Sequence, residues 1–97
     1  MEYKNEEYKT SFTVPDRVTV RAQMAYYSES ARAGGDELFM RLWFGARTLI
    51  QNWQSELLPD LHTDLETVTD PTVTAVLMWA AMRVQEHINK LETLPKN

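Results

Sequence analysis

The fold is decided by residues 73–84, VTAVLMWAAMRV. If this stretch is helical, it carries apolar side chains on two sides at about 100° per residue. The first side consists of Val73, Val76, Leu77, Ala80 and Val84, and the second of Ala75, Met78, Trp79 and Met82. An ordinary surface helix is polar opposite its apolar stripe, so this helix needs two surfaces to pack against. In a chain of 97 residues the second surface is often another molecule.

The start of this helix is strongly marked. Asp70 can cap the helix with its carboxylate, and Pro71 suits the first helical position. The pattern predicts a helix from Pro71 to about Glu92, with its inner face continuing at Ile88 and Leu91.

Two shorter helices are predicted before it. The first begins near Asp16 or Thr19 and ends at Gly34-Gly35, and the second runs from Asp36, as its cap, to about Gln54. Their predicted core stripes are Val20, Met24, Tyr27 and Ala31, and Leu38, Leu42, Ala46, Leu49 and Trp53. Met40 and Phe44 fall on the far side of the second helix. Gly45 faces its core stripe, where the missing side chain would let another helix approach closely.

The remaining segments predict little regular structure. Residues 1–10 are polar without periodicity, Ser11–Val14 can be extended, and residues 57–70 form a connector with one short helical turn at Asp64–Val68. We therefore predict an all-α fold: a small three-helix bundle, with or without an extra short helix, and an extended N-terminal arm. The predicted divisions are a mobile or extended arm at 1–15 and a helical domain at 16–97.

The composition indicates the cellular compartment in which the protein is expected. The chain has a formal net charge of −4 and no cysteine, which excludes disulfides and thiolate metal sites. Its polar N-terminus is unlike a signal peptide, and its longest apolar run is far too short to span a bilayer. We expect a soluble cytoplasmic protein without a membrane partner. The acidic residues between Thr48 and Met82, where Lys and Arg are absent, form either a solvated surface or a patch that attracts a basic partner.

No pattern predicts catalysis. Asp60, His62, Asp64 and Glu66 alternate as in the start of a calcium loop, but the required glycine and final glutamate are missing. His87 lacks the second histidine of a zinc-protease helix and is expected to be a boundary residue with a hydrogen-bonded ring. We predict that the protein is not an enzyme and has no catalytic, cofactor-binding or metal-binding residues.

A protein partner is the favoured hypothesis. Trp is enriched in interface hot spots and Met suits adaptable surfaces. The candidate partner-binding residues are Met78, Trp79, Met82, Met40 and Phe44. They would bind an apolar helical client, a second copy of the chain, or both. In the alternative, the third helix is central and the chain itself covers both of its sides. Nucleic-acid binding through Arg17, Arg21 and the tyrosines at 26 and 27 is less favoured.

Several stretches together suggest a family. These are Val14-Pro15-Asp16 before a helix, the tryptophan-bearing residues 41–53 (RLWFGARTLIQNW), the acidic connector, and the ending LETLPKN at 91–97. The chain after residue 10 resembles small tail assembly chaperones of tailed bacteriophages, in their short form. The resemblance implies a mostly helical fold and no catalytic residues. It also implies binding to apolar helices of a tape-measure protein, which stay soluble until tail-tube subunits polymerise around them.

Two other hypotheses stay open. The protein could be a structural virion component of the head–tail connector or tail, whose N-terminal arm adds a strand to a neighbour. It could also be a small phage inhibitor of a host protein, because an acidic surface can mimic nucleic acid.

Overall fold

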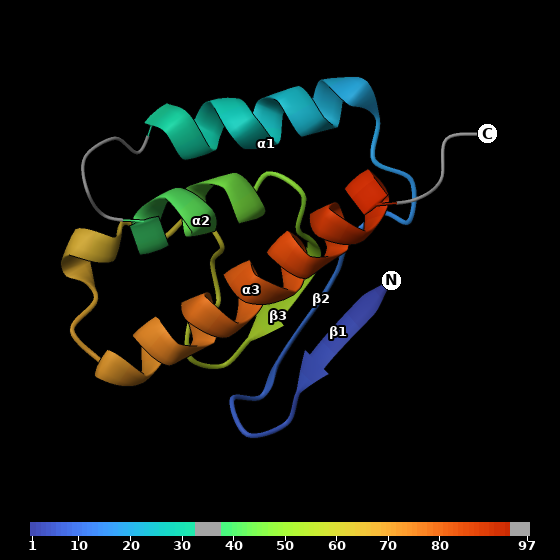
Figure 1. Cartoon of the computed structure of the whole chain (residues 1–97). Helices are drawn as coiled ribbons and strands as arrows, with labels where there is room; N and C mark the ends of the chain where they lie inside the picture. Colours follow the sequence, from blue (N-terminus) through green and yellow to red (C-terminus); the bar gives the residue numbers. More distant parts are fainter. Residues whose placement is uncertain (33–37, 94–97) are drawn as a thin grey trace.

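The computed structural model describes residues 1–32 and 38–93, with side chains described up to residue 90. These residues form three α-helices, one 3-10 turn and a three-stranded antiparallel sheet. In chain order the elements are β1 (Glu2–Asn5), β2 (Thr10–Thr13), α1 (Val20–Arg32), α2 (Leu38–Ala46), β3 (Gln51–Ser55), η1 (Leu65–Thr67) and α3 (Pro71–Thr93). The prediction of an all-α bundle is therefore wrong. Figure 1 shows α3 lying across one face of the sheet, with α2 beside it and α1 on the far side of α2.

The predicted N-terminal arm is part of this sheet. β2 is the central strand and pairs with β1 on one side and β3 on the other. A turn at residues 6–9 joins β1 to β2, and Lys9 closes it with a left-handed φ of 48° and a bond from its N–H to the Glu6 carbonyl. Phe12 and Val14 are fully buried, so the arm belongs to the core and does not hang free of a helical domain. The extended conformation expected at Ser11–Val14 is confirmed.

The second predicted helix is too long. α2 ends at Ala46, and β3 occupies residues that the prediction placed in the helix. The backbone tightens here, because the amides of Thr48 and Leu49 bond to carbonyls three residues earlier, at Gly45 and Ala46. The Thr48 hydroxyl also donates to the Gly45 carbonyl at 2.7 Å. These local bonds replace the helical pattern and end α2 without proline.

β3 carries a bulge. Ser11 pairs with Gln54 and Thr13 with Gln51, so β3 has one more residue than β2 over this interval. Asn52 adopts the left-handed conformation, with φ 54°, which asparagine tolerates better than most residues. Its side-chain amide donates to the Thr13 hydroxyl at 3.0 Å and fixes the bulge to the central strand.

α3 follows its prediction closely. The Asp70 carboxylate accepts from the Thr72 N–H at 2.9 Å, which confirms the cap before Pro71. The predicted inner face is buried at Val73, Val76, Leu77, Ala80, Val84 and Ile88. The short turn predicted at Asp64–Val68 is also present as η1, with Asp64 as its cap.

α1 is helical as expected, but its predicted core stripe is wrong. Val20, Met24 and Tyr27 are 73%, 66% and 49% exposed, whereas the neighbouring Tyr26 is buried. Tyr26 donates its hydroxyl to Gln85 Oε1 of α3 at 2.7 Å. The predicted glycine break at 34–35 and the cap at Asp36 lie outside the described residues.

Gly45 explains how α1 and α2 pack. A Cβ at this position would lie 3.1 Å from the Tyr26 carbonyl oxygen and 3.2 Å from the Tyr26 ring and Ser30 Cβ. The predicted close approach of a second helix at Gly45 is therefore confirmed, and α1 is that helix.

Candidate functional site

An apolar groove runs between α2 and α3. Its volume is about 300 Å³, and the residues that line it are Leu38, Phe39 and Leu42 of α2 and Met78, Ala81 and Met82 of α3. Although the groove is apolar, three of its side chains are substantially exposed: Leu38 at 66%, Met78 at 49% and Met82 at 41%. These three side chains are only partly buried in the folded chain alone, so further burial against a partner would stabilise the complex.

Helical spacing builds both walls. Leu38 and Leu42 lie one turn apart on α2, and Met78 and Met82 lie one turn apart on α3. Ala81 is buried and has a small side chain, which leaves room between the two walls. The result is a slot whose long direction follows two helix axes, with flexible methionines on one wall.

The structure brings together only part of the predicted partner-binding set. Met78 and Met82 both line the groove, whereas Trp79 turns toward the sheet. Its ring meets Phe12 of β2 edge-on, with centroids 5.4 Å apart. Trp79 is thus partly buried by its own chain, as in the alternative that the third helix is covered on both sides. Its geometry fits a residue that joins α3 to the sheet.

Met40 and Phe44 lie on a different surface. They line a separate hollow of about 450 Å³ with Asp64, Leu65 and Glu66 from the η1 region. The Arg47 guanidinium lies 4.4 Å from the centre of the Phe44 ring, which places a cation over this aromatic face. These two predicted residues are therefore not in the groove.

Four groove residues were missing from the predicted set: Leu38, Phe39, Leu42 and Ala81. The sequence did indicate that the leucines were apolar and on one face, but it assigned that face to the core. Within the described part of α2, the buried residues Trp43, Gly45 and Ala46 lie toward its C-terminal end, whereas Leu38 is exposed. No signal in the sequence separated Leu38 from the core stripe.

The acidic connector lies apart from the groove lining. Glu56, Asp60, Asp64, Glu66 and Asp70 are all exposed. Three of these carboxylates accept backbone N–H bonds two residues ahead, at His62, Glu66 and Thr72. Local turn and cap formation therefore accounts for much of the acidic pattern.

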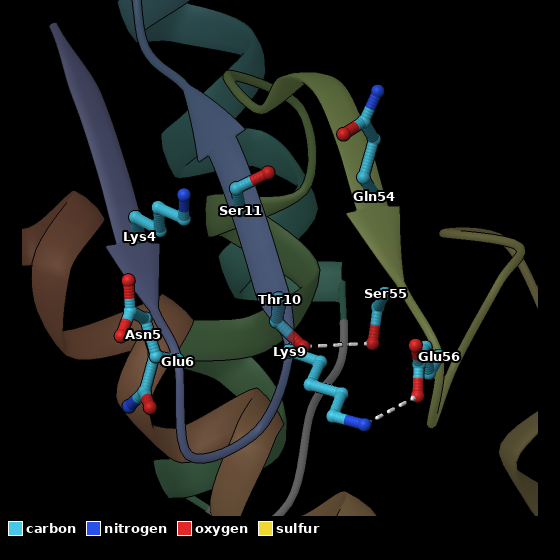
Figure 2. Close-up of a pocket in the computed structure, with 9 residues that line it drawn as sticks. All are labelled: Lys4, Asn5, Glu6, Lys9, Thr10, Ser11, Gln54, Ser55 and Glu56. Atoms are coloured by element: carbon cyan, nitrogen blue, oxygen red, sulfur yellow. Dashed lines mark hydrogen bonds and ion pairs between the residues drawn. The ribbon is translucent and has the colours of Figure 1, made fainter.

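A polar hollow lies on the open face of the sheet, and its charged side chains do not form a binding site for one class of ligand. Figure 2 shows its lining side chains on and beside all three strands, with Lys9 directed toward Glu56. That ion pair spans 3.6 Å between exposed groups, and Thr10 and Ser55 share a hydrogen bond of 2.8 Å. Charges of both signs line the hollow, so it does not select one class of charged ligand.

The ring of His87 joins α3 to the N-terminal segment through hydrogen bonds. Its Nε2 lies 2.9 Å from the Pro15 carbonyl oxygen, which can only accept, so Nε2 carries the proton. Nδ1 is then free to accept from the Tyr3 hydroxyl at 3.5 Å. The predicted hydrogen-bonded ring is confirmed, but His87 is buried and does not lie at the boundary of the core. Within the part of the chain that the structure describes, no group of His, Asp and Glu side chains could hold a metal ion.

Comparison with known proteins adds no relative. No protein-family model matches the chain, and no curated protein or solved structure matches it either. Among the described residues, no helix has both the length and the apolar character that crossing a membrane requires. The α2–α3 groove is therefore the candidate site on the strength of its own geometry.

Proposed function

We propose that this protein is a non-enzymatic binding module that holds an apolar helix of a partner protein in the α2–α3 groove. The observation that carries the proposal is the exposure of Leu38, Met78 and Met82 around a slot lined only by apolar side chains among the described residues. Helix-in-groove recognition uses such a surface, with side chains of the bound helix at positions i, i+3 or i+4, and i+7.

The groove suits several related helices better than one fixed sequence. Methionine is unbranched and polarizable, so Met78 and Met82 can adjust to different side chains. Without a charged residue in the lining, affinity would come from apolar burial and not from a fixed ion pair. A client of this kind is a protein whose amphipathic helices await assembly.

The narrower form of the proposal is an assembly chaperone for a tape-measure-like protein of a tailed phage. The fold combines its helices with a three-stranded sheet and is not an all-α bundle, so the support for this role is the groove and not the architecture. The chaperone would act in the cytoplasm of the host cell. A reducing compartment suits this chain, because it has no cysteine and so forms no disulfide.

The five methionines allow a direct test. Each methyl group can be labelled with ¹³C and followed by NMR while a synthetic amphipathic peptide, with leucines at i, i+3 and i+7, is added. We expect shifts at Met78 and Met82 and little change at Met24 on α1 and at Met40, which is not part of the groove lining. Shifts confined to Met24 or Met40, or none at any methionine, would contradict the proposed groove.

Substitutions separate binding from folding. Met82→Glu should place a charge in the groove and weaken peptide binding at least tenfold while the protein stays folded, since Met82 is 41% exposed. Met24→Glu is the matched control, because Met24 is also an exposed helical methionine but lies outside the groove. Equal loss of binding in both variants would argue against a specific site.

Trp79→Ala should have the opposite effect to Met82→Glu: it should lower stability and leave peptide binding unchanged. The ring packs on Phe12, so its removal should lower the free energy of unfolding by about 2–3 kcal/mol, below the range for fully buried tryptophan. Binding per folded molecule should change little. If the Trp79→Ala protein is as stable as wild type but no longer binds the peptide, then Trp79 contacts the peptide and the groove assignment is wrong.

A further inference from the structure

A second surface, independent of the groove, lies along β1. This strand is at one edge of the sheet, and Figure 1 shows it at the outer margin of the molecule. The backbones of Met1 and Val14 exchange two hydrogen bonds, of 2.7 and 2.9 Å, and so form a hydrogen-bonded antiparallel pair. Because the pattern alternates along a strand, Tyr3 and Asn5 also bond toward β2. The N–H and C=O groups of Glu2 and Lys4 therefore point outward.

The opposite edge of the sheet is less suited to pairing. β3 is interrupted by the bulge at Asn52, which twists a strand and breaks the regular spacing of its outward groups. β1 pairs with β2 in unbroken register over its four residues. A regular edge that no other described strand pairs with is a template for another strand.

We propose that two copies of this chain associate through β1, with the two strands antiparallel and a two-fold axis at Tyr3. The two sheets would then form one continuous sheet of six strands. This arrangement leaves the α2–α3 groove out of the interface, and it does not depend on what the groove binds.

The charges on β1 select this register. Only residues with outward backbone groups can form hydrogen-bonded pairs across the edge, which leaves Glu2 and Lys4 as the pairing residues. A two-fold axis at Glu2 would oppose the two Glu2 side chains, and an axis at Lys4 would oppose the two Lys4 side chains. With the axis at Tyr3, Glu2 of each copy faces Lys4 of the partner subunit, so both cross-strand pairs join opposite charges.

The same register satisfies the outward backbone groups. Each pair of Glu2 with Lys4 of the partner subunit exchanges two hydrogen bonds, so the interface gains four. Charged residues on natural edge strands usually prevent pairing, but this alternation of acid and base is complementary to itself. With so short a strand, the contact is small, and the dimer should dissociate on dilution.

Charge exchange tests the pairing. The mass of the full chain would be measured by sedimentation equilibrium over a range of concentrations, for wild type, Glu2→Lys, Lys4→Glu and the double exchange. Each single variant turns two attractive pairs into two repulsive ones and should weaken dimerisation by about tenfold. The double exchange restores opposite charges in both pairs and should recover the wild-type mass. Far-ultraviolet circular dichroism verifies that all four proteins are folded.

Hydrogen exchange at the Lys4 amide supplies a second measure. The Lys4 N–H should exchange more slowly with solvent as the protein concentration rises. The Gln54 amide is the control, because it lies on β3, at the opposite edge of the sheet, and its exchange rate should not depend on concentration. A wild-type protein that stays monomeric at high concentration would overturn the proposal. A dimer unaffected by the single charge variants would also overturn it, because the contact would then lie elsewhere.

Discussion

α1 and α3 both carry more apolar side chains than one helix face can bury, yet the chain treats them differently. On α3 the predicted inner face is buried from Val73 to Ile88. On α1 the predicted face, including Val20 and Met24, is exposed, and the buried face is centred on Tyr26. The same periodicity argument was therefore right for one helix and wrong for the other.

The difference lies in what each helix packs against. The inner face of α3 is a dense row of β-branched and small residues that covers the sheet and α2, so its apolar content fixes its orientation. At Gly45, where α2 has no side chain, the backbone and the ring of Tyr26 from α1 approach α2 closely. Shape at one glycine, and not the number of apolar residues, sets the rotation of α1.

The adjacent tyrosines of α1 give the largest contrast. Tyr26→Ala should lower the free energy of unfolding by about 3–4 kcal/mol, because it removes a buried ring and the hydroxyl bond to Gln85. Tyr27→Ala should cost less than about 1 kcal/mol, since that side chain is half exposed. Urea unfolding of both variants measures the difference, and equal costs would show that α1 is rotated from the orientation described.

Gly45→Ala should change the free energy of unfolding less, because two opposing contributions partly cancel. Helix propensity alone would stabilise α2 by about 1 kcal/mol. The new methyl would crowd the Tyr26 backbone oxygen, which can yield only if α1 moves, at a cost of about 1–3 kcal/mol. We expect a net loss of about 1 kcal/mol in thermal or urea unfolding. Ser28→Ala on the exposed side of α1 is the control, and it should not destabilise.

The smallest effect concerns the sheet side of α3 and depends on pH. Burial against this helix, and then the negative charge of Glu86, raise the pKa of Tyr3 above its ordinary value of 10.0. The folded protein thus keeps this proton at pH values where the unfolded chain has lost it. The resulting contribution to stability is present below the ordinary pKa and is lost as pH rises through the folded one.

Tyr3→Phe checks this dependence. The stability of the variant should fall less steeply than that of wild type above pH 10.0, the ordinary tyrosine value. Glu86→Gln should lower the pKa of Tyr3 in an ultraviolet titration. The pKa should stay above its ordinary value, because burial, the larger cause of the shift, is unchanged. Identical alkaline stability profiles for wild type and Tyr3→Phe would contradict the burial of this phenol.

Much of the helical structure could be predicted because its signals are local. Asp70-Pro71 marks the start of α3 through a side-chain cap, and Asp64 marks η1 in the same way. The strands have no such signals. β1 is charged and polar except at Tyr3, and β3 contains a single apolar residue, Trp53. Each becomes a strand only because β2 lies beside it, and that contact is not local in sequence.

The candidate site was predictable to a similar extent. Met78 and Met82 could be found because they lie on the second apolar side of a well-marked helix. Trp79 lies on that same side in projection, but it turns toward Phe12, a residue assigned to a free arm. With the arm taken as mobile, the sequence left two roles open for Trp79, a contact within the chain or a contact with a partner. The strand that was missed in the arm accounts for the wrong fold class, and it supplies the contact with Trp79 within the chain.

The central place of β2 has a consequence for how the chain is made. Its pairing partner β3 begins about forty residues later, and α3, which covers its buried side, follows later still. During synthesis Phe12 leaves the ribosome before Trp53 and Trp79, the two residues whose rings pack against it. Such distant contacts close slowly compared with helices. The ring of Phe12 can therefore be buried completely only after the residues of α3 have been made.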